Sequence, residues 1–203
     1  MLTPLTPLLQ QAREAGAGLG AMNVIQIELA EAIVSGAEAA GRPVVLQISE
    51  NTVAYHGALK PIAAASLAIA EAASVDVCVH LDHAVSMSLV DEALKLGIPS
   101  VMYDASTLPY ADNVASTAAL AARCRGLGVS LEAELGEVGG KDGVHAPGVR
   151  TDPGEAAAFV SATGVDALAV AVGSSHAMTS REAVLDDELI VALAAAVPVP
   201  LVL

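Results

Sequence analysis

The sequence is short of aromatic residues and of positive charge, and each shortage excludes a class of function. Among 203 residues there are one Phe, three Tyr and no Trp, so the 54% hydrophobic content is mainly aliphatic and alanine-rich. Nine Lys and Arg stand against 23 Asp and Glu, which gives a formal net charge of −14. Nucleic acids and anionic membranes bind surfaces on which Lys and Arg cluster, so we expect neither as a partner. A phosphorylated small molecule remains compatible, because one metal ion and a few backbone N–H groups can supply positive charge locally.

Cysteines and long hydrophobic runs are also scarce. Cys78 and Cys124 are too few for a disulfide framework and favour a reducing compartment, and we expect Cys78 to be a small core residue. The first residues, MLTPLTPLLQQAREAG, have no basic region before their apolar residues, so they do not predict a signal peptide. No apolar run reaches the roughly 18 residues of a transmembrane helix. We therefore expect a cytoplasmic protein.

What the sequence does contain is a repeated rhythm of short apolar runs and helical stretches. The runs recur at intervals of roughly 25–35 residues, about the length of one βαβ unit. Gly41, Gly97 and Gly128 follow the intervening helical patterns, where glycines commonly end helices. Runs that are apolar on both faces are typical of buried strands in a parallel sheet. The runs are 18–24, 43–49, 75–82, 99–106, 128–135, 165–173 and 197–203.

This rhythm predicts an α/β fold of the (β/α)8 type, the TIM barrel. A doubly wound dinucleotide-binding sheet is less favoured, because no strand ends in a convincing glycine-rich turn. A complete barrel has eight strands, and this chain covers about seven βα units. We therefore expect residues 1–203 to form a single barrel domain whose C-terminal part is absent.

Polar side chains gather at the C-terminal ends of six of these runs. In a parallel α/β fold that edge binds the ligand, so a succession of polar strand ends predicts a site there. The residues concerned are Asn23, Ser49, Asp82 with His83, Asp104, Glu134 and the segment 173–176, which holds Gly173 and His176.

Four of the strand-end side chains have the chemistry of a metal site. Imidazole and carboxylate groups suit Zn²⁺ or a similar divalent ion, and His83, His176, Glu134 and Asp104 supply both. Neighbouring residues on a strand point to opposite faces, so Asp82 should point away from His83. We therefore expect Asp82 to transfer protons rather than to bind the metal.

Structural roles stay open for several of these residues. We expect His80 to be structural, either orienting a neighbour or filling the barrel, His56 to be a loop residue and His145 to be solvated. Asp104 and Glu134 could accept hydrogen bonds from metal ligands instead of binding the ion themselves. A lone strand-end histidine is often structural too, but its pairing with an acid and a second strand-end histidine favours a ligand.

Five segments, taken in order, carry a resemblance to a known family. They are AMNVIQIELAEAI, VHLDHA, SVMYDAS, LEAELGEVGGKDGV and AVAVGSSHAM. These segments resemble the successive strand-end motifs of the class II, metal-dependent fructose-bisphosphate aldolases. The resemblance implies a (β/α)8 barrel, a homodimer or larger homo-oligomer, and a catalytic Zn²⁺ ion. It also implies aldol cleavage of fructose 1,6-bisphosphate to dihydroxyacetone phosphate and glyceraldehyde 3-phosphate, and the reverse condensation.

The resemblance also implies roles for the strand-end residues. His83 and His176 would be zinc ligands, and Glu134 and Asp104 would belong to a second or inner metal position. Asp82 would be the acid that protonates the aldehyde oxygen in the condensation direction.

Further roles that the resemblance implies concern the substrate and a loop. Asn23, Ser49 and Gly173 would bind the sugar phosphate. The loop GGKDGV would be a mobile flap, in which Asp142 moves a proton on the dihydroxyacetone phosphate carbon. A monovalent cation is a second cofactor that the resemblance allows, although Ala177 stands where the family usually has a glycine that helps to bind it.

The lysines indicate a metal route without reference to any family. A Schiff-base aldolase needs a lysine in its site, and of Lys60, Lys95 and Lys141 none ends a predicted inner strand. Two alternatives stay open: an aldolase for tagatose bisphosphate or another ketose phosphate, and a metal-binding barrel without catalysis. Because the family's third zinc histidine would follow Leu203, we also expect the 203-residue form to be impaired.

Overall fold

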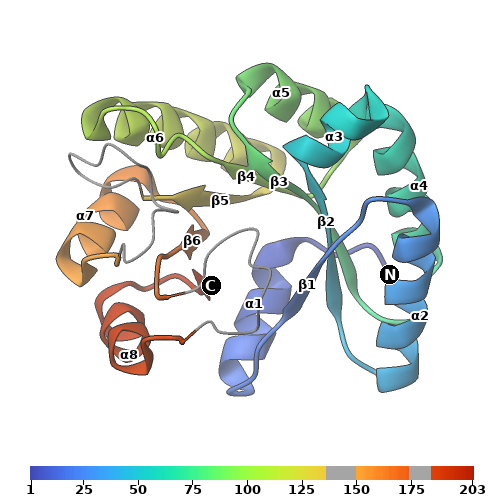
Figure 1. The fold of residues 1–203 in the computed structure, drawn as a ribbon, viewed down its shortest axis with the longest axis horizontal. Helices are drawn as coiled ribbons and strands as arrows, with labels where there is room; N and C mark the ends of the chain where they lie inside the picture. Colours follow the sequence, from blue (N-terminus) through green and yellow to red (C-terminus); the bar gives the residue numbers. More distant parts are fainter. Residues whose placement is uncertain (136–149, 174–183) are drawn as a thin grey trace. The chain divides into compact units, whose positions relative to one another are not determined.

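The computed structural model describes residues 1–135, 150–173 and 184–203. Figure 1 shows these residues as alternating helices and strands. The predicted flap with Asp142, and also His145 and His176, lie outside the described residues. The elements are α1 (Leu5–Glu14), β1 (Gly20–Asn23), α2 (Ile27–Ala40), β2 (Val44–Ser49), α3 (Glu50–His56), α4 (Leu59–Ala72), β3 (Val77–Ala84), α5 (Met87–Leu96), β4 (Ser100–Tyr103), α6 (Tyr110–Leu127), β5 (Ser130–Glu134), α7 (Pro153–Thr163), β6 (Ala167–Ala169), α8 (Asp187–Ala196) and β7 (Leu201–Val202).

The chain divides into two compact units, which we describe separately. The first comprises Met1–Tyr103 and Arg125–Ser130, and the second comprises Asp104–Cys124 and Leu131–Leu203. In the first unit β1, β2, β3 and β4 pair in chain order and in parallel. In the second unit β5, β6 and β7 do the same. Each strand overlaps one of the apolar runs, which confirms the predicted series of parallel strands with helices between them. The prediction of a single domain stays a prediction.

Helix ends lie where glycine allows a left-handed backbone. Gly41 and Gly97 follow α2 and α5 with φ of 60° and 81°, and their N–H groups bond to the last turn of each helix. A residue with a Cβ is strained in that region, so glycine stops the helix at little cost. These two positions confirm the helix ends predicted from the sequence.

The core of the first unit lies around β2 and β3, which are almost entirely buried. Leu5 and Leu8 of α1 pack against Val45 and Cys78, which are paired residues near the starts of these two strands. Figure 1 shows α2 and α4 running alongside the same strands. Cys78 is fully buried, as predicted, and burial raises the pKa of its thiol to about 12. The four residues of β1 are all exposed by contrast.

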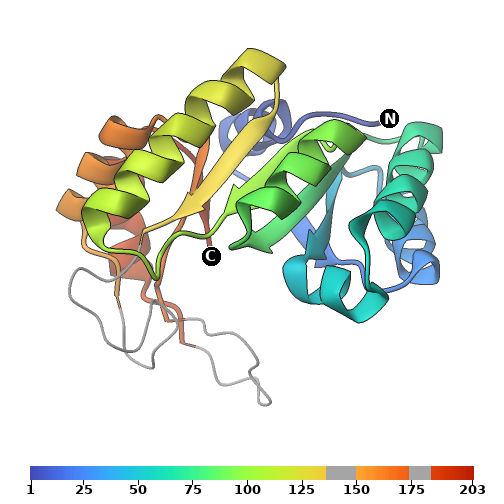
Figure 2. The same cartoon turned by 90° about the horizontal axis from the view of Figure 1, so that it is seen from above.

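In the second unit, Phe159 of α7 is a large, fully buried side chain. Its ring lies 6.4 Å from the ring of Tyr110 on α6, between ring centres, and Figure 2 shows these two helices side by side. Asp152 and Asp186 cap α7 and α8 by accepting hydrogen bonds from N–H groups of the first turns. Such caps satisfy backbone donors that the helix itself leaves open.

Among the described residues, no single helix is long and apolar enough to cross a membrane. The consecutive helices α3 and α4 meet that requirement only when taken together, and they are bent by 114° where they join.

Candidate active site

Two of the predicted site residues, Asp82 and His83, lie near the carboxyl end of β3, and His80 precedes them on the same strand. His80 and Asp82 are both buried, with exposed fractions of 1% and 6%. They are two residues apart on a strand and so share a face, and His80 Nε2 lies 3.9 Å from Asp82 Oδ1. The other ring nitrogen, His80 Nδ1, shares a hydrogen bond of 2.7 Å with Ser100 Oγ on β4. His80 is therefore held between two strands beside the predicted acid.

The strand does not continue regularly through His83. Leu81 pairs with Val101 and Ala84 pairs with Tyr103, so β3 has one residue more than β4 between these two pairs. His83 has a φ of 49°, which is uncommon for a residue other than glycine. These are the features of a β-bulge, which re-aims a side chain and often lies beside an active site. The regular alternation of side chains between the two strand faces, from which we expected Asp82 to point away from His83, is therefore interrupted at His83.

Burial determines the charge of His80. Desolvation, together with a smaller effect of the neighbouring His83, lowers its pKa to about 3. The imidazole is therefore neutral at neutral pH and can hold a hydrogen bond without adding positive charge. This supports the structural role expected for His80.

We predict that His80 makes the protein less stable in mild acid. Below its ordinary pKa of about 6.5 the unfolded chain binds a proton at this residue, whereas the folded chain does not until about pH 3. The stability contributed by neutral His80 is therefore complete above pH 6.5 and is lost as the pH falls towards 3. The loss approaches about 1.4 kcal/mol per pH unit from this group.

Urea unfolding of the unsubstituted protein and of His80→Gln between pH 4 and 7.5 measures this effect. The variant should show a flatter fall of the unfolding free energy with acid, while the exposed His56→Gln control should keep the original slope. Equal slopes in all three proteins would contradict the prediction. His56, which the sequence placed in a loop, is the last residue of α3 and donates from Nε2 to the Ile25 carbonyl oxygen over 2.6 Å.

Two acids lie together in the second unit. Asp104 follows β4 and accepts a hydrogen bond of 3.0 Å from the Ser106 N–H, which fixes a turn. Glu134 is the last residue of β5 and is 5% exposed. Their carboxylates offer oxygen atoms within 4.8 Å of each other. Two like charges at this separation repel, and a divalent cation between them would remove that repulsion.

Buried amide and hydroxyl groups hold the end of β5 in place. The Asn113 side chain of α6 donates to the Glu134 carbonyl oxygen over 3.2 Å, and Thr117 donates to the Asn113 side-chain oxygen over 2.9 Å. Both α6 side chains are buried, so these bonds form away from competing water. Sequence reasoning missed Asn113 and Thr117, because nothing in a helical segment marks which strand end its polar side chains reach.

The predicted substrate-binding residues also lie at strand ends. Asn23 ends β1 and is exposed. Ser49 ends β2, where its hydroxyl accepts a hydrogen bond of 3.1 Å from the Thr52 N–H and caps α3. Gly173 follows β6 with a φ of 114°, and a Cβ there would collide with the Val184 carbonyl oxygen. Only glycine fits this turn, because the Val184 backbone occupies the space that a Cβ would need.

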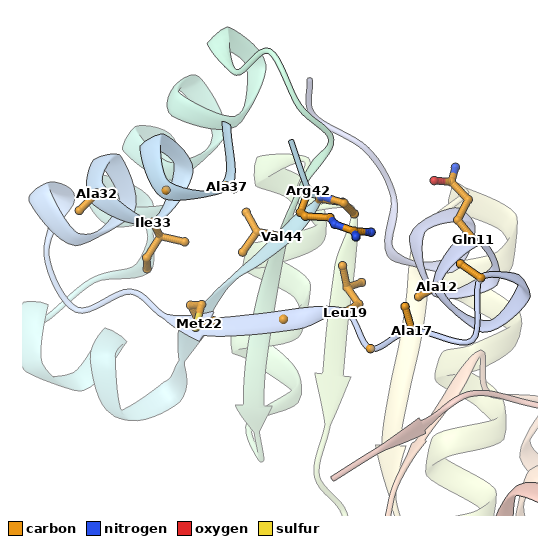
Figure 3. A pocket seen from close by; sticks show the side chains of 15 residues that line it. Gln11, Ala12, Ala17, Leu19, Met22, Ala32, Ile33, Ala37, Arg42 and Val44 are labelled. Carbon is orange, nitrogen blue, oxygen red and sulfur yellow. The ribbon is translucent and has the colours of Figure 1, made fainter. Parts of the chain in front are cut away.

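A cavity of about 660 Å³ lies elsewhere in the first unit. It opens beside Gly20 and Val44, the first residues of β1 and β2, so it lies at the amino ends of these strands. Figure 3 shows its wall of small and aliphatic side chains, with Leu19 and Ile33 among them and Arg42 at one side. Because the site residues lie at the opposite strand ends, this cavity is not the predicted substrate site.

The architecture is that of a parallel βα enzyme scaffold, in which ligands bind at the carboxyl ends of the strands. Comparison with known proteins defines it further. The family model for class II fructose-bisphosphate aldolase matches residues 3–203. The chain is 37% identical over 209 residues to a fructose-bisphosphate aldolase from Thermus caldophilus, with 100% of this chain and 68% of that protein covered. It is 36% identical over 203 residues to a 6-phospho-5-dehydro-2-deoxy-D-gluconate aldolase from Shouchella clausii, with 98% and 69% covered.

Solved structures give the same result for the fold. The YdjI aldolase from Escherichia coli matches 99% of this chain and 72% of its own, with a TM-score of 0.86 and 30% sequence identity. A structure from Coccidioides immitis described as a fructose-1,6-bisphosphate aldolase matches 97% of this chain and 71% of its own, with a TM-score of 0.83 and 32% identity. These matches confirm the predicted TIM-barrel fold class, with seven parallel strands among the described residues.

The chain belongs to the class II fructose-bisphosphate aldolase family, whose members are generally metal-dependent. It spans between 54% and 69% of the length of the curated relatives that it matches.

Proposed function

We propose that this protein catalyses the zinc-dependent cleavage of fructose 1,6-bisphosphate into dihydroxyacetone phosphate and glyceraldehyde 3-phosphate, and the reverse condensation. The observation that carries the proposal is a family match over residues 3–203 in which acid and imidazole side chains fall at consecutive strand ends. In a βα barrel all strand carboxyl ends share one face, so residues from different strands can act on one substrate.

The metal would be held by His83 and His176, with Glu134 and Asp104 at a second or inner position. The donor set fits a divalent ion, because it combines imidazole with a carboxylate pair whose oxygens lie within 4.8 Å. When bound, such an ion stabilises the negative charge that carbon–carbon cleavage leaves on the substrate oxygens. This assignment also explains why a strongly acidic chain could accept a phosphorylated substrate.

Asp82 would protonate the aldehyde oxygen during condensation and remove that proton during cleavage. It is buried beside a neutral His80, so its carboxyl group is shielded from bulk water and its position is restricted. Asn23 and Ser49 would bind substrate hydroxyl or phosphate oxygens, and the backbone N–H of Gly173 would bind a phosphate oxygen. Asp142 would move the proton on the dihydroxyacetone phosphate carbon.

A second candidate substrate has specific support. The Shouchella clausii relative carries the name of a different aldolase at 36% identity, close to the 37% identity of the Thermus caldophilus fructose-bisphosphate aldolase. Identity alone therefore does not select the sugar. Tagatose bisphosphate or another ketose phosphate is the alternative substrate, and a metal-binding barrel without catalysis is the alternative function.

We predict that cleavage of fructose 1,6-bisphosphate has the highest kcat/KM among the candidate substrates. The assay compares it with tagatose 1,6-bisphosphate and 6-phospho-5-dehydro-2-deoxy-D-gluconate. It is run on the 203-residue chain, which we expect to be impaired. A higher kcat/KM for another sugar would reassign the substrate. Zinc that raises the melting temperature, without turnover of any of the three, would favour the non-catalytic barrel.

We also propose that the protein forms a homodimer or larger homo-oligomer in the cytoplasm, and that a monovalent cation assists phosphate binding. Sedimentation equilibrium tests the oligomeric state, and cell fractionation tests the cytoplasmic location. Replacing K⁺ by a bulky organic cation in the assay tests the role of the monovalent cation.

A further inference from the structure

An acid on α3 reaches across to the segment that follows β3. Glu50 is the first residue of α3, directly after the end of β2. Its Oε2 accepts a hydrogen bond of 2.6 Å from the Val85 N–H and a longer one of 3.4 Å from the Ser86 N–H. An ionised carboxylate makes such bonds stronger than a neutral acceptor would. The β2–α3 junction is therefore tied to the β3–α5 junction.

The bonded residues form the start of α5. Ser86 is the N-cap of this helix, and its own hydroxyl makes no capping hydrogen bond. A helix N-terminus has open N–H groups and a partial positive charge, so an acid placed there is stabilising. Glu50 supplies that acid from a different helix. Glu50 therefore stabilises the N-terminus of α5, although it belongs to the first turn of α3.

The tied segment begins two residues after His83. His83 lies in the bulge of β3 with a φ of 49°, a conformation that persists only where surrounding contacts hold it. On one side, Asp82 pairs with Ser49 on β2, and the pairing with β4 resumes at Ala84. On the other side, Glu50 holds the backbone N–H of Val85. The bulge is therefore anchored at both of its ends.

We propose that Glu50 is a positioning residue that fixes the bulge at His83 and so aims its imidazole at the metal. The inference rests on the proposed metal site. Groups that orient a ligand without touching the metal commonly change affinity by about 10–100-fold when they are removed. Glu50 acts through the backbone after the ligand and not through the imidazole itself.

Three substitutions of Glu50 distinguish the effect of its side-chain length from the effect of its charge. Glu50→Asp keeps the charge but shortens the side chain, and Glu50→Ala removes the acceptor altogether. Both should weaken Zn²⁺ binding about 10–100-fold in competition with a chelating dye. Glu50→Gln keeps an oxygen at the same reach and should stay within a few-fold of the unsubstituted protein. The exposed Glu71→Ala on α4 is the matched control and should bind Zn²⁺ normally.

Two further readouts do not depend on turnover. Amide hydrogen exchange of Val85 should accelerate in metal-free Glu50→Asp and Glu50→Ala, because the bond to its N–H is lost. The visible absorption bands of bound Co²⁺ should change in the same two variants, because the ligand geometry changes. If Glu50→Ala does not fold, Glu50→Asp decides the outcome.

Wild-type zinc affinity and wild-type cobalt bands in Glu50→Asp would overturn the proposal. So would equal losses in Glu50→Gln and Glu50→Ala with none in Glu50→Asp, since charge alone would then be responsible. If the unsubstituted protein binds no metal, this proposal and the metal site are both refuted. Metal binding that depends on Glu50, without aldol turnover, would refute only the proposed reaction.

Discussion

Replacing Asp82 with alanine is expected to lower aldol turnover by about 10²–10⁴-fold, the usual contribution of a positioned general acid or base. The metal content should stay nearly unchanged. Asp82 is 6% exposed and lies on the same strand face as His80, whereas the proposed ligand His83 occupies the bulge that follows. Removing the carboxyl group therefore removes the proton carrier and leaves the imidazole ligand in place.

Zinc stoichiometry and steady-state kinetics on the same preparation measure both effects. Asp112→Ala, which removes an exposed acid from α6, is the control and should keep both properties. If Asp82→Ala loses its metal in proportion to its activity, Asp82 is a ligand and the division of roles between Asp82 and His83 is wrong.

Removing the metal with a chelator is expected to reduce aldol cleavage to background, and added Zn²⁺ should restore it. Borohydride, which traps a Schiff base, should leave the protein mass unchanged in the presence of substrate. Lys60 and Lys95 lie within α4 and α5, and neither is at the carboxyl end of a strand. The metal route therefore does not need a lysine in the site, whereas a Schiff-base route would.

Mass spectrometry after borohydride treatment, with and without fructose 1,6-bisphosphate, reports any covalent adduct. The melting temperature of the chelator-treated protein is measured in parallel, because loss of the fold would also abolish activity. An adduct on Lys60 or Lys141 together with activity that resists the chelator would replace the metal mechanism with a covalent one.

The order of the strands, and the polar residue at the end of each, could be predicted from the sequence. Burial on both faces makes a strand apolar along its length, so β2 and β3 stand out as runs, and Ser49 and Asp82 stand out as polar residues within them. Glycines at the helix ends were predictable for a similar reason, since Gly41 and Gly97 have backbone angles that other residues adopt at a cost.

The pairing of β3 could not be predicted in the same way. The run from 75 to 82 read as a regular strand, but β3 extends to Ala84 and contains an extra residue beside β4. A bulge changes the register between two strands while leaving the composition of each one intact. His83 was found as a candidate ligand, but its left-handed backbone was not.

The sequence by itself determined the succession of βα units, the family, and the set of strand-end side chains that carry the candidate chemistry. Each of these depends on the burial or chemistry of a short segment. Only the tertiary structure decided that Ser100 bonds to His80 from 20 residues away, and that Glu50 holds Val85 from 35 residues away. Those bonds arise because parallel strands and their helices bring distant backbone groups to one strand end, and the periodicity of a segment contains no information on which partner it meets there.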